Sequence, residues 1–132
     1  MTGQGKLAGS LVFVYGTLRR GESNHFLIQS ARYCGEHRTS PEYHFWDCGA
    51  YPAASRGGST AIDGELYGVS PRLLRALDRL EDVPRLYRRE IISTDLGSAW
   101  IYLVRGRPPG APKLALGDWC ARRGCTHMEQ EA

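Results

Sequence analysis

One glutamate stands where its side chain faces a predicted protein core. Residues 71–81 have the spacing of an amphipathic helix, with one apolar stripe formed by Leu73, Leu74, Leu77 and Leu80. Glu81 lies seven residues after Leu74 and four after Leu77, so it falls inside this stripe. Burial and the C-terminal end of the helix dipole both disfavour a charged carboxylate, and they raise its pKa toward the range useful for proton transfer. Glu81 is therefore a candidate general acid and base.

A structural explanation of the same pattern stays open. Glu81 could pair with Arg88 or Arg89, which follow within a few residues, or the last helical turn could fray and expose the carboxylate. Structural ion pairs perturb carboxylates much as active sites do, so the spacing alone does not separate the two interpretations.

A short apolar strand, residues 11–15, runs directly into a loop that is suited to bind a polar group. This segment, called the 15–18 loop below, consists of Tyr15, Gly16, Thr17 and Leu18. Because glycine has no Cβ, backbone N–H groups at Gly16 can come close to a ligand. A strand that ends in such a loop can present those groups to an anion or to a polarised carbonyl. The 15–18 loop is therefore a candidate substrate cradle.

Other catalytic motifs are absent from the sequence. The glycine-containing segment after residue 15 lacks the Gly-Lys-Ser/Thr ending of a P-loop, and no serine lies in a G-x-S-x-G elbow. The cysteines form no C-x-x-C pair and no Cys/His spacing typical of a zinc site; they are Cys34, Cys48, Cys120 and Cys125. We therefore expect reduced thiols and no zinc site at these cysteines.

Composition and charge narrow the class of protein. The chain has 132 residues and a net charge of +3, and fifteen of its seventeen basic residues are arginine. The arginines are scattered and form no run that would follow a phosphate backbone, so we do not expect nucleic-acid binding. The longest early apolar run is too short for a signal peptide or a membrane span, which predicts a cytoplasmic protein without a membrane partner. A monomer and a homodimer are both compatible with the sequence.

The elements that must position these residues are mostly short strands. We expect a single domain over residues 1–132, with flexible ends at 1–9 and 125–132. Local patterns predict helices at 23–31, 71–81 and 116–123, a loop at 49–58, and strands at 11–15, 33–37, 43–47, 61–69, 88–94 and 99–105. Short, glycine-marked strands with few helices favour an α+β fold, a small mixed β-barrel or curled sheet, over a doubly wound parallel sheet. Four tyrosines are expected to pack in this core, and each could turn its hydroxyl to a ligand; they are Tyr15, Tyr67, Tyr87 and Tyr102.

Several motifs in register resemble the γ-glutamylcyclotransferase-like superfamily, in particular its small bacterial YtfP-type and butirosin-biosynthesis-type members. They occur in family order and span nearly the whole chain. The matching pieces are Val14-Tyr15-Gly16-Thr17-Leu18-Arg19-Arg20-Gly21 with Asn24-His25, Gly49-Ala50-Tyr51-Pro52-Ala53, Gly64-Glu65-Leu66-Tyr67, Leu77-Asp78-Arg79-Leu80-Glu81 with Tyr87-Arg88-Arg89, Gly97-Ser98-Ala99-Trp100-Ile101-Tyr102, and Gly117-Asp118-Trp119. Asp82 stands where the family usually has glycine.

The resemblance implies a fold, a reaction and a site. The fold is a small mixed β-barrel flanked by short helices, with a cavity at its mouth. The reaction is cleavage of a γ-glutamyl amide to 5-oxoproline and a free amine, without metal or cofactor. Glu81 would be the catalytic acid and base, and the glutamyl group would be held by Tyr15, Gly16, Thr17, Leu18, Asn24, Tyr87 and Tyr102.

Two alternatives to this enzyme remain at the level of sequence. A protein of the same family could bind a small metabolite without turning it over, in which case a ligand would stabilise it against heat and release no product. An arginine-based nucleic-acid binder would instead show binding that falls steeply with salt.

Overall fold

A five-stranded sheet forms the centre of the computed structural model, which describes residues 9–121. Its strand order is β2-β5-β1-β7-β6. The strands are β1 Ser10–Val14, β2 Arg32–Arg38, β5 Asp63–Val69, β6 Arg88–Thr94 and β7 Gly97–Leu103. β1 pairs antiparallel with β5 and parallel with β7, and the other neighbours are antiparallel. β1 therefore lies in the middle of the sheet, and its C-terminal end delivers the 15–18 loop.

The period of two along β1 divides the core into two clusters. Val12 and Val14 pack on one face of the sheet with Leu77, whereas Phe13 and Tyr15 pack on the other face with Ile101. All six side chains are buried. Apolar residues on both faces are typical of a central strand that is covered on two sides. This agrees with the buried strand predicted at 11–15.

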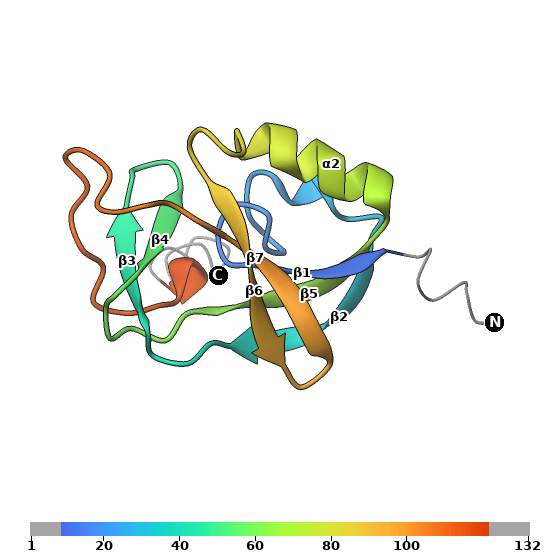
Figure 1. The fold of residues 1–132 in the computed structure, drawn as a ribbon, viewed down its shortest axis with the longest axis horizontal. Helices are drawn as coiled ribbons and strands as arrows, with labels where there is room; N and C mark the ends of the chain where they lie inside the picture. Colours follow the sequence, from blue (N-terminus) through green and yellow to red (C-terminus); the bar gives the residue numbers. More distant parts are fainter. Residues whose placement is uncertain (1–8, 122–132) are drawn as a thin grey trace, which may run out of the picture.

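A two-stranded sheet stands beside the first, as Figure 1 shows. It consists of β3 Tyr43–Asp47 and β4 Pro52–Arg56, paired antiparallel. The predicted loop at 49–58 is wrong, because β4 occupies its centre. Proline is tolerated as the first residue of a strand, where its missing N–H costs no ladder bond, so Pro52 does not prevent pairing. Val104 N–H donates to the Ala54 carbonyl at 2.8 Å and links β4 to the end of β7.

The α+β class is confirmed, and the small β-barrel stays a prediction. Within residues 9–121, strand pairing gives two separate sheets and no closed ring. Of the residues predicted to be flexible, 1–9 and 125–132, all but Gly9 lie outside the described range.

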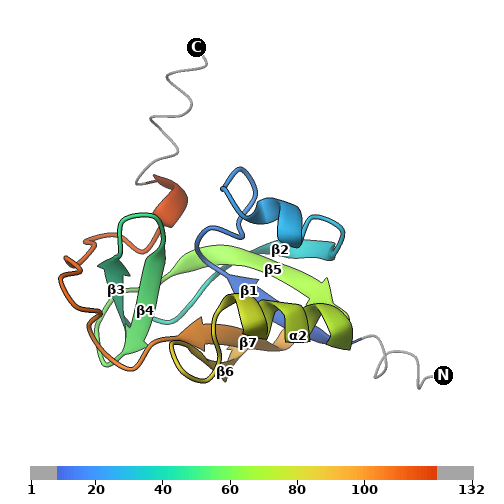
Figure 2. The same ribbon diagram turned by 90° about the horizontal axis from the view of Figure 1, so that it is seen from above.

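Helix α2, Pro71–Leu80, covers one face of the five-stranded sheet, as Figure 2 shows from above. The Ser70 hydroxyl caps it by accepting a hydrogen bond from the Leu73 N–H at 3.1 Å, and Pro71 occupies the first turn. Leu77 is fully buried against the sheet, but Leu80 at the helix end is 44% exposed. The expected apolar stripe is thus correct through Leu77 and opens to solvent at its last residue. No helix within residues 9–121 is long and apolar enough to cross a membrane.

The predicted helix at 23–31 is wrong. The segment contains only a short 3-10 helix, η1, His25–Leu27. Leu27 N–H bonds to the Asn24 carbonyl and Ile28 N–H to the His25 carbonyl, both three residues back. The Asn24 side chain does not cap this turn; its Nδ2 donates to Thr17 Oγ1 at 2.9 Å instead. A tertiary contact with the 15–18 loop therefore replaces the cap that a longer helix would need.

The remaining boundaries differ by a few residues. β3 and β6 match the predicted strands at 43–47 and 88–94, and β7 begins two residues earlier than predicted because Gly97 already adopts φ of 114° in a tight hairpin turn. Helical backbone begins at Trp119 and continues to residue 121, the last described residue. The predicted helix at 116–123 is therefore wrong at its first three residues, and residues 122–123 lie outside the description. Cys34, Cys48 and Cys120 are free thiols, and Cys125 is outside the described residues.

Candidate active site

A cavity of about 320 Å³ opens where the ends of several elements meet. The C-terminal end of β1, the start of β4, the end of α2 and the strand β7 all border it. The side chains and backbone that line it belong to Phe13, Val14, Tyr15, Gly16, Thr17, Leu18, Ser23, Asn24, Ala50, Tyr51, Pro52, Leu80, Glu81, Leu86, Tyr87 and Tyr102. Its size is at the lower end of the range for small-molecule sites.

The cavity brings together every residue that the sequence singled out for the site. Glu81 lines it, as do Tyr15, Gly16, Thr17, Leu18, Asn24, Tyr87 and Tyr102. Tyr67, the fourth tyrosine considered, does not, because its hydroxyl donates to Glu65 Oε1 at 2.9 Å inside the core. Sequence reasoning missed Tyr51, Leu80 and Leu86 as cavity residues. A signal existed for Tyr51, which lies in one of the motifs shared with the family.

Glu81 is the residue at which α2 ends. Its N–H still donates to the Leu77 carbonyl at 2.9 Å, and the next residue, Asp82, has φ of 57°. This left-handed conformation turns the chain out of the helix, and aspartate is one of the few residues besides glycine that adopt it readily. The Glu81 side chain is thereby left at the cavity wall, partly buried.

Burial raises the pKa of the Glu81 carboxyl to about 7, from an ordinary value of 4.5. The two arginines that could have neutralised it are engaged elsewhere. Arg88 Nε lies 2.6 Å from Glu90 Oε2, and Arg89 Nε lies 2.9 Å from Asp78 Oδ1. Within residues 9–121 the Glu81 carboxylate forms no ion pair, so the interpretation of Glu81 as a paired structural residue is not supported.

The 15–18 loop is fixed by its carbonyls and side chains, which leaves its N–H groups available. The Gly16 carbonyl accepts from Arg19 N–H at 3.0 Å, and the Thr17 carbonyl accepts from Asn24 N–H at 2.8 Å. In the described part of the chain, the N–H groups of Gly16, Thr17 and Leu18 have no hydrogen-bond acceptor. Because all three residues line the cavity, their N–H groups are candidate donors to a bound ligand.

Three tyrosines surround Glu81 and turn their hydroxyls to the protein. Tyr15 donates to the Tyr102 carbonyl at 2.6 Å, Tyr87 to the Pro52 carbonyl at 3.2 Å, and Tyr102 to Asp78 Oδ1 at 2.7 Å. Burial raises the pKa of each phenol, and the charge of Glu81 adds to this effect. These hydroxyls therefore remain protonated, and their hydrogen bonds hold this part of the cavity wall in place.

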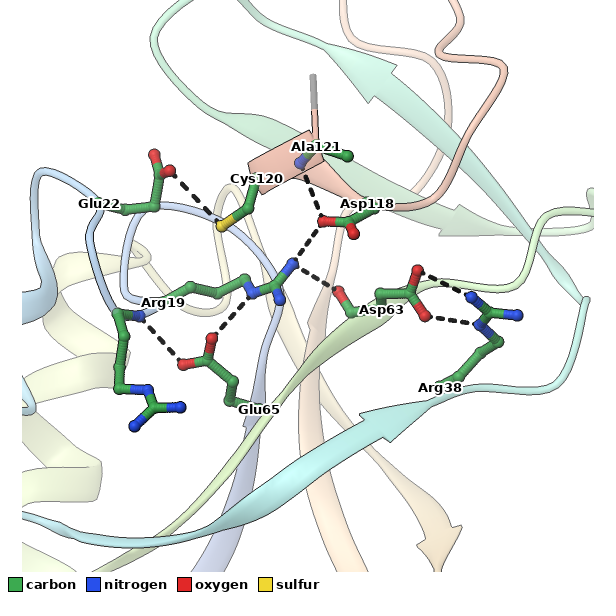
Figure 3. A network of polar contacts seen from close by, with 9 residues as sticks. Arg19, Glu22, Arg38, Asp63, Glu65, Asp118, Cys120 and Ala121 are labelled. Carbon is green, nitrogen blue, oxygen red and sulfur yellow. Dashed lines mark hydrogen bonds and ion pairs between the residues drawn. The ribbon is translucent and has the colours of Figure 1, made fainter. Parts of the chain in front are cut away.

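The far end of the 15–18 loop is anchored by a buried polar network, drawn in Figure 3. Arg19 Nε donates to Glu65 Oε2 at 3.1 Å, and its Nη1 donates to Asp118 Oδ1 at 2.8 Å. Glu65 Oε1 also accepts from the Arg20 N–H at 3.0 Å. Arg19 and Glu65 are both more than nine-tenths buried. The arginine that follows the loop thus holds it to β5 and to the segment before residue 119.

Comparison with known proteins identifies the family of the chain. The family model "Gamma-glutamyl cyclotransferase, AIG2-like" matches residues 12–121. A Vibrio cholerae protein named as a gamma-glutamylcyclotransferase is 47% identical over 112 residues, which cover 85% of this chain and 96% of that protein. The human gamma-glutamylaminecyclotransferase is 34% identical over 111 residues, covering 77% of this chain and 68% of its own length.

A solved structure extends the likeness to the fold. The crystal structure of a Pyrococcus horikoshii protein superposes with a TM-score of 0.77 at 26% identity, covering 91% of this chain and 98% of the other. Sequence motifs, fold and family match agree, and the chain belongs to the AIG2-like gamma-glutamylcyclotransferase family of enzymes.

Proposed function

We propose that the protein cleaves γ-glutamyl amides by intramolecular cyclisation. The α-amine of the substrate attacks its own γ-carbonyl carbon, and the products are 5-oxoproline and a free amine. The observation that supports this reaction most strongly is the pairing of two features in one cavity: Glu81, with no ion-pair partner in residues 9–121 and a pKa of about 7, and the 15–18 loop with its available N–H groups.

The proton balance of the reaction requires a base that becomes an acid. The α-amine is an ammonium in the resting substrate, so Glu81 as carboxylate takes a proton from it. The new bond joins this nitrogen to the γ-carbonyl carbon, and the bond from that carbon to the leaving nitrogen breaks. Over the whole reaction the α-nitrogen loses two protons and the leaving amine gains both. A carboxyl group with a pKa of about 7 exchanges protons in both directions at neutral pH.

The 15–18 loop supplies the electrostatic part of the mechanism. Negative charge develops on the γ-carbonyl oxygen in the tetrahedral intermediate, and N–H groups fixed beforehand stabilise it at no reorganisation cost. The cavity supplies the rest by holding the substrate folded, because ring closure is intramolecular and its rate depends on that conformer. Tyr87 and Tyr102 would pack against the aliphatic part of the glutamyl group, and Asn24 beside Thr17 would offer a polar contact.

The experiment is a release assay for 5-oxoproline with a panel of γ-glutamyl amides. We expect turnover by the wild type and a loss of about 10²–10⁴-fold in kcat for Glu81→Gln, the usual range for general acid–base groups. Glu36→Gln, at an exposed position on β2, is the matched control. Ligand-induced stabilisation without any turnover would instead identify a binding protein, and unchanged activity in Glu81→Gln would reject the mechanism.

A further inference from the structure

His25 lies next to the cavity residue Asn24 but does not itself line the cavity formed by residues 9–121. It is the first residue of the 3-10 turn η1, and its backbone is fixed on both sides. The His25 N–H donates to the Glu22 carbonyl at 3.2 Å, and the His25 carbonyl accepts from the Ile28 N–H at 2.9 Å. Ile28 is fully buried in the core. The His25 imidazole, which the proposed mechanism does not use, therefore has a defined place in the fold.

The imidazole donates a hydrogen bond to the backbone of the 15–18 loop. His25 Nδ1 lies 2.9 Å from the carbonyl oxygen of Leu18. A carbonyl oxygen only accepts hydrogen bonds, so Nδ1 carries the hydrogen of this bond. The ring of His25 also packs near the ring of Tyr67, with the two centroids 6.0 Å apart, and this contact fixes its orientation from a second side.

A chain of hydrogen bonds leads from His25 to the cavity through two peptide units. The Leu18 carbonyl and the Arg19 N–H belong to one planar peptide unit. The Arg19 N–H donates to the Gly16 carbonyl at 3.0 Å, and that carbonyl shares its peptide unit with the Thr17 N–H. Thr17 lines the cavity, and its N–H has no acceptor within residues 9–121. The chain thus begins at the imidazole and ends at an N–H group that is available to a ligand.

The bonds in such a chain strengthen one another. A peptide carbonyl that accepts a hydrogen bond makes the N–H of its own unit a better donor, by about 10–30% per bond. Asn24 acts in the same way on the neighbouring unit, because its N–H donates to the Thr17 carbonyl at 2.8 Å and that unit ends in the Leu18 N–H. Asn24 and His25 therefore hold the two peptide units that carry the Thr17 and Leu18 N–H groups.

We infer that His25 is a positioning residue of the cyclisation. Its Nδ1–H holds the 15–18 loop and polarises the Thr17 N–H, which stabilises the negative charge on the γ-carbonyl oxygen. This inference rests on the proposed function, which places that oxygen at the N–H groups of the loop. Because the charge develops on the way to the transition state, His25 acts on kcat and leaves the binding of the substrate unchanged.

The test compares three variants at position 25 in the 5-oxoproline assay. Asparagine carries its amide nitrogen on Cγ, as histidine carries Nδ1, so His25→Asn keeps a donor for the Leu18 carbonyl. His25→Gln places the amide one carbon further out, and His25→Phe keeps a ring but has no donor. We expect kcat to fall about tenfold in His25→Gln and His25→Phe, and to stay within about threefold of wild type in His25→Asn, with KM unchanged in all three.

His44→Phe is the matched control. His44 is partly buried, as His25 is, but it lies on β3 and outside the cavity lining, so this variant should keep the wild-type kcat and KM. The pH dependence of kcat/KM that follows from Glu81 should also be unchanged in His25→Phe. Melting temperatures check the fold, and if His25→Phe is unstable, the comparison of His25→Asn with His25→Gln decides.

Three results would overturn the inference and leave the proposed function intact. They are a wild-type kcat in His25→Phe and His25→Gln, a loss of kcat/KM that lies entirely in KM, and a kcat in His25→Asn no higher than in His25→Gln. A changed pH dependence in His25→Phe would assign His25 to proton transfer and would overturn it as well. Absence of 5-oxoproline release by the wild type would overturn both the inference and the proposed function.

Discussion

Asp78 and Glu81 lie one helical turn apart at the end of α2, and their carboxylates have opposite surroundings. Asp78 Oδ1 is 2.9 Å from Arg89 Nε and accepts a hydrogen bond from the Tyr102 hydroxyl at 2.7 Å. Glu81 has no such partner within residues 9–121, and burial alone raises its pKa to about 7. Of these two neighbouring acids, Asp78 therefore holds the cavity wall through its bonded partners, whereas Glu81 is available to exchange protons.

The pH dependence of activity should follow Glu81. If its carboxylate is the base, kcat/KM rises with pH, about tenfold per unit on the acid side, and levels off above about 7. Glu36→Gln should keep this acid limb. An acid limb with its midpoint near pH 4.5, the ordinary pKa of a glutamate, would contradict the assignment of Glu81 as the base. A midpoint near pH 7 that persists in Glu81→Gln would contradict it as well.

The same pKa predicts how stability changes with pH. The folded pKa of about 7 is above the ordinary value of 4.5, so between these values the folded protein holds a proton that the unfolded chain has released. The contribution of Glu81 to the free energy of unfolding therefore falls as pH rises from 4.5 to 7. In urea unfolding, we compare the free energy of unfolding of Glu81→Gln with that of the wild type. The variant's advantage should be about 2–3 kcal/mol larger at pH 8 than at pH 4. A pH-independent difference would show that Glu81 is not desolvated.

The hydrogen bond between Tyr102 and Asp78 should appear as a coupling energy. We expect Tyr102→Phe and Asp78→Ala to be non-additive by about 1–2 kcal/mol in the free energy of unfolding, because each removes the same bond to a charged group. Tyr87→Phe with Asp78→Ala is the control pair, since the Tyr87 hydroxyl donates to the Pro52 carbonyl instead. Additive effects of Tyr102→Phe and Asp78→Ala would contradict the bond.

The buried ion pair of Arg19, which anchors the 15–18 loop, should contribute far more to the free energy of unfolding than an exposed ion pair does. Arg19→Met leaves Glu65 buried without its cation, and we expect a loss of about 3–5 kcal/mol in the free energy of unfolding. Arg38→Met, whose side chain is 70% exposed and pairs with Asp63 at 2.6 Å, is the matched control and should change stability little, because exposed pairs are screened. Denaturant unfolding of both variants gives the comparison, and similar losses would contradict the role of burial.

The residues that line the cavity were easier to predict than the elements that carry them. The helical period placed Glu81 on the inward stripe, and the strand that ends at Val14 placed the 15–18 loop, because both follow from local spacing. The meeting of these two segments in one cavity is tertiary, and only the family resemblance anticipated it. The predicted helix at 23–31 was wrong because a tertiary contact decides the conformation there. Asn24 resembles a helix cap in sequence, but its side-chain amide donates to the Thr17 hydroxyl instead.

Leu80 and Leu86, two exposed apolar residues that line the cavity, had no sequence signal that would identify them as cavity residues. Leu80 continues the apolar stripe of α2 and therefore predicts a core residue, yet the helix ends there and leaves it 44% exposed. Leu86 lies in a turn whose course depends on the left-handed conformation of Asp82. An aspartate at this position does not by itself predict that conformation. Solvent-exposed apolar residues at a ligand opening are indistinguishable in sequence from residues of the core.

A methyl group at Gly16 should directly displace the 15–18 loop or the Pro52 ring that it contacts. A Cβ built there would come 2.7 Å and 2.8 Å from the ring carbons Cδ and Cγ of Pro52, too close unless the 15–18 loop or β4 shifts. Both segments line the cavity, so we expect Gly16→Ala to lower kcat/KM by about tenfold or more and stability by about 1–3 kcal/mol. Gly106→Ala, whose Cβ would meet no atom within 4 Å, is the matched control for both measurements. Wild-type kinetics in Gly16→Ala would mean that the contact of the loop with Pro52 does not position the substrate.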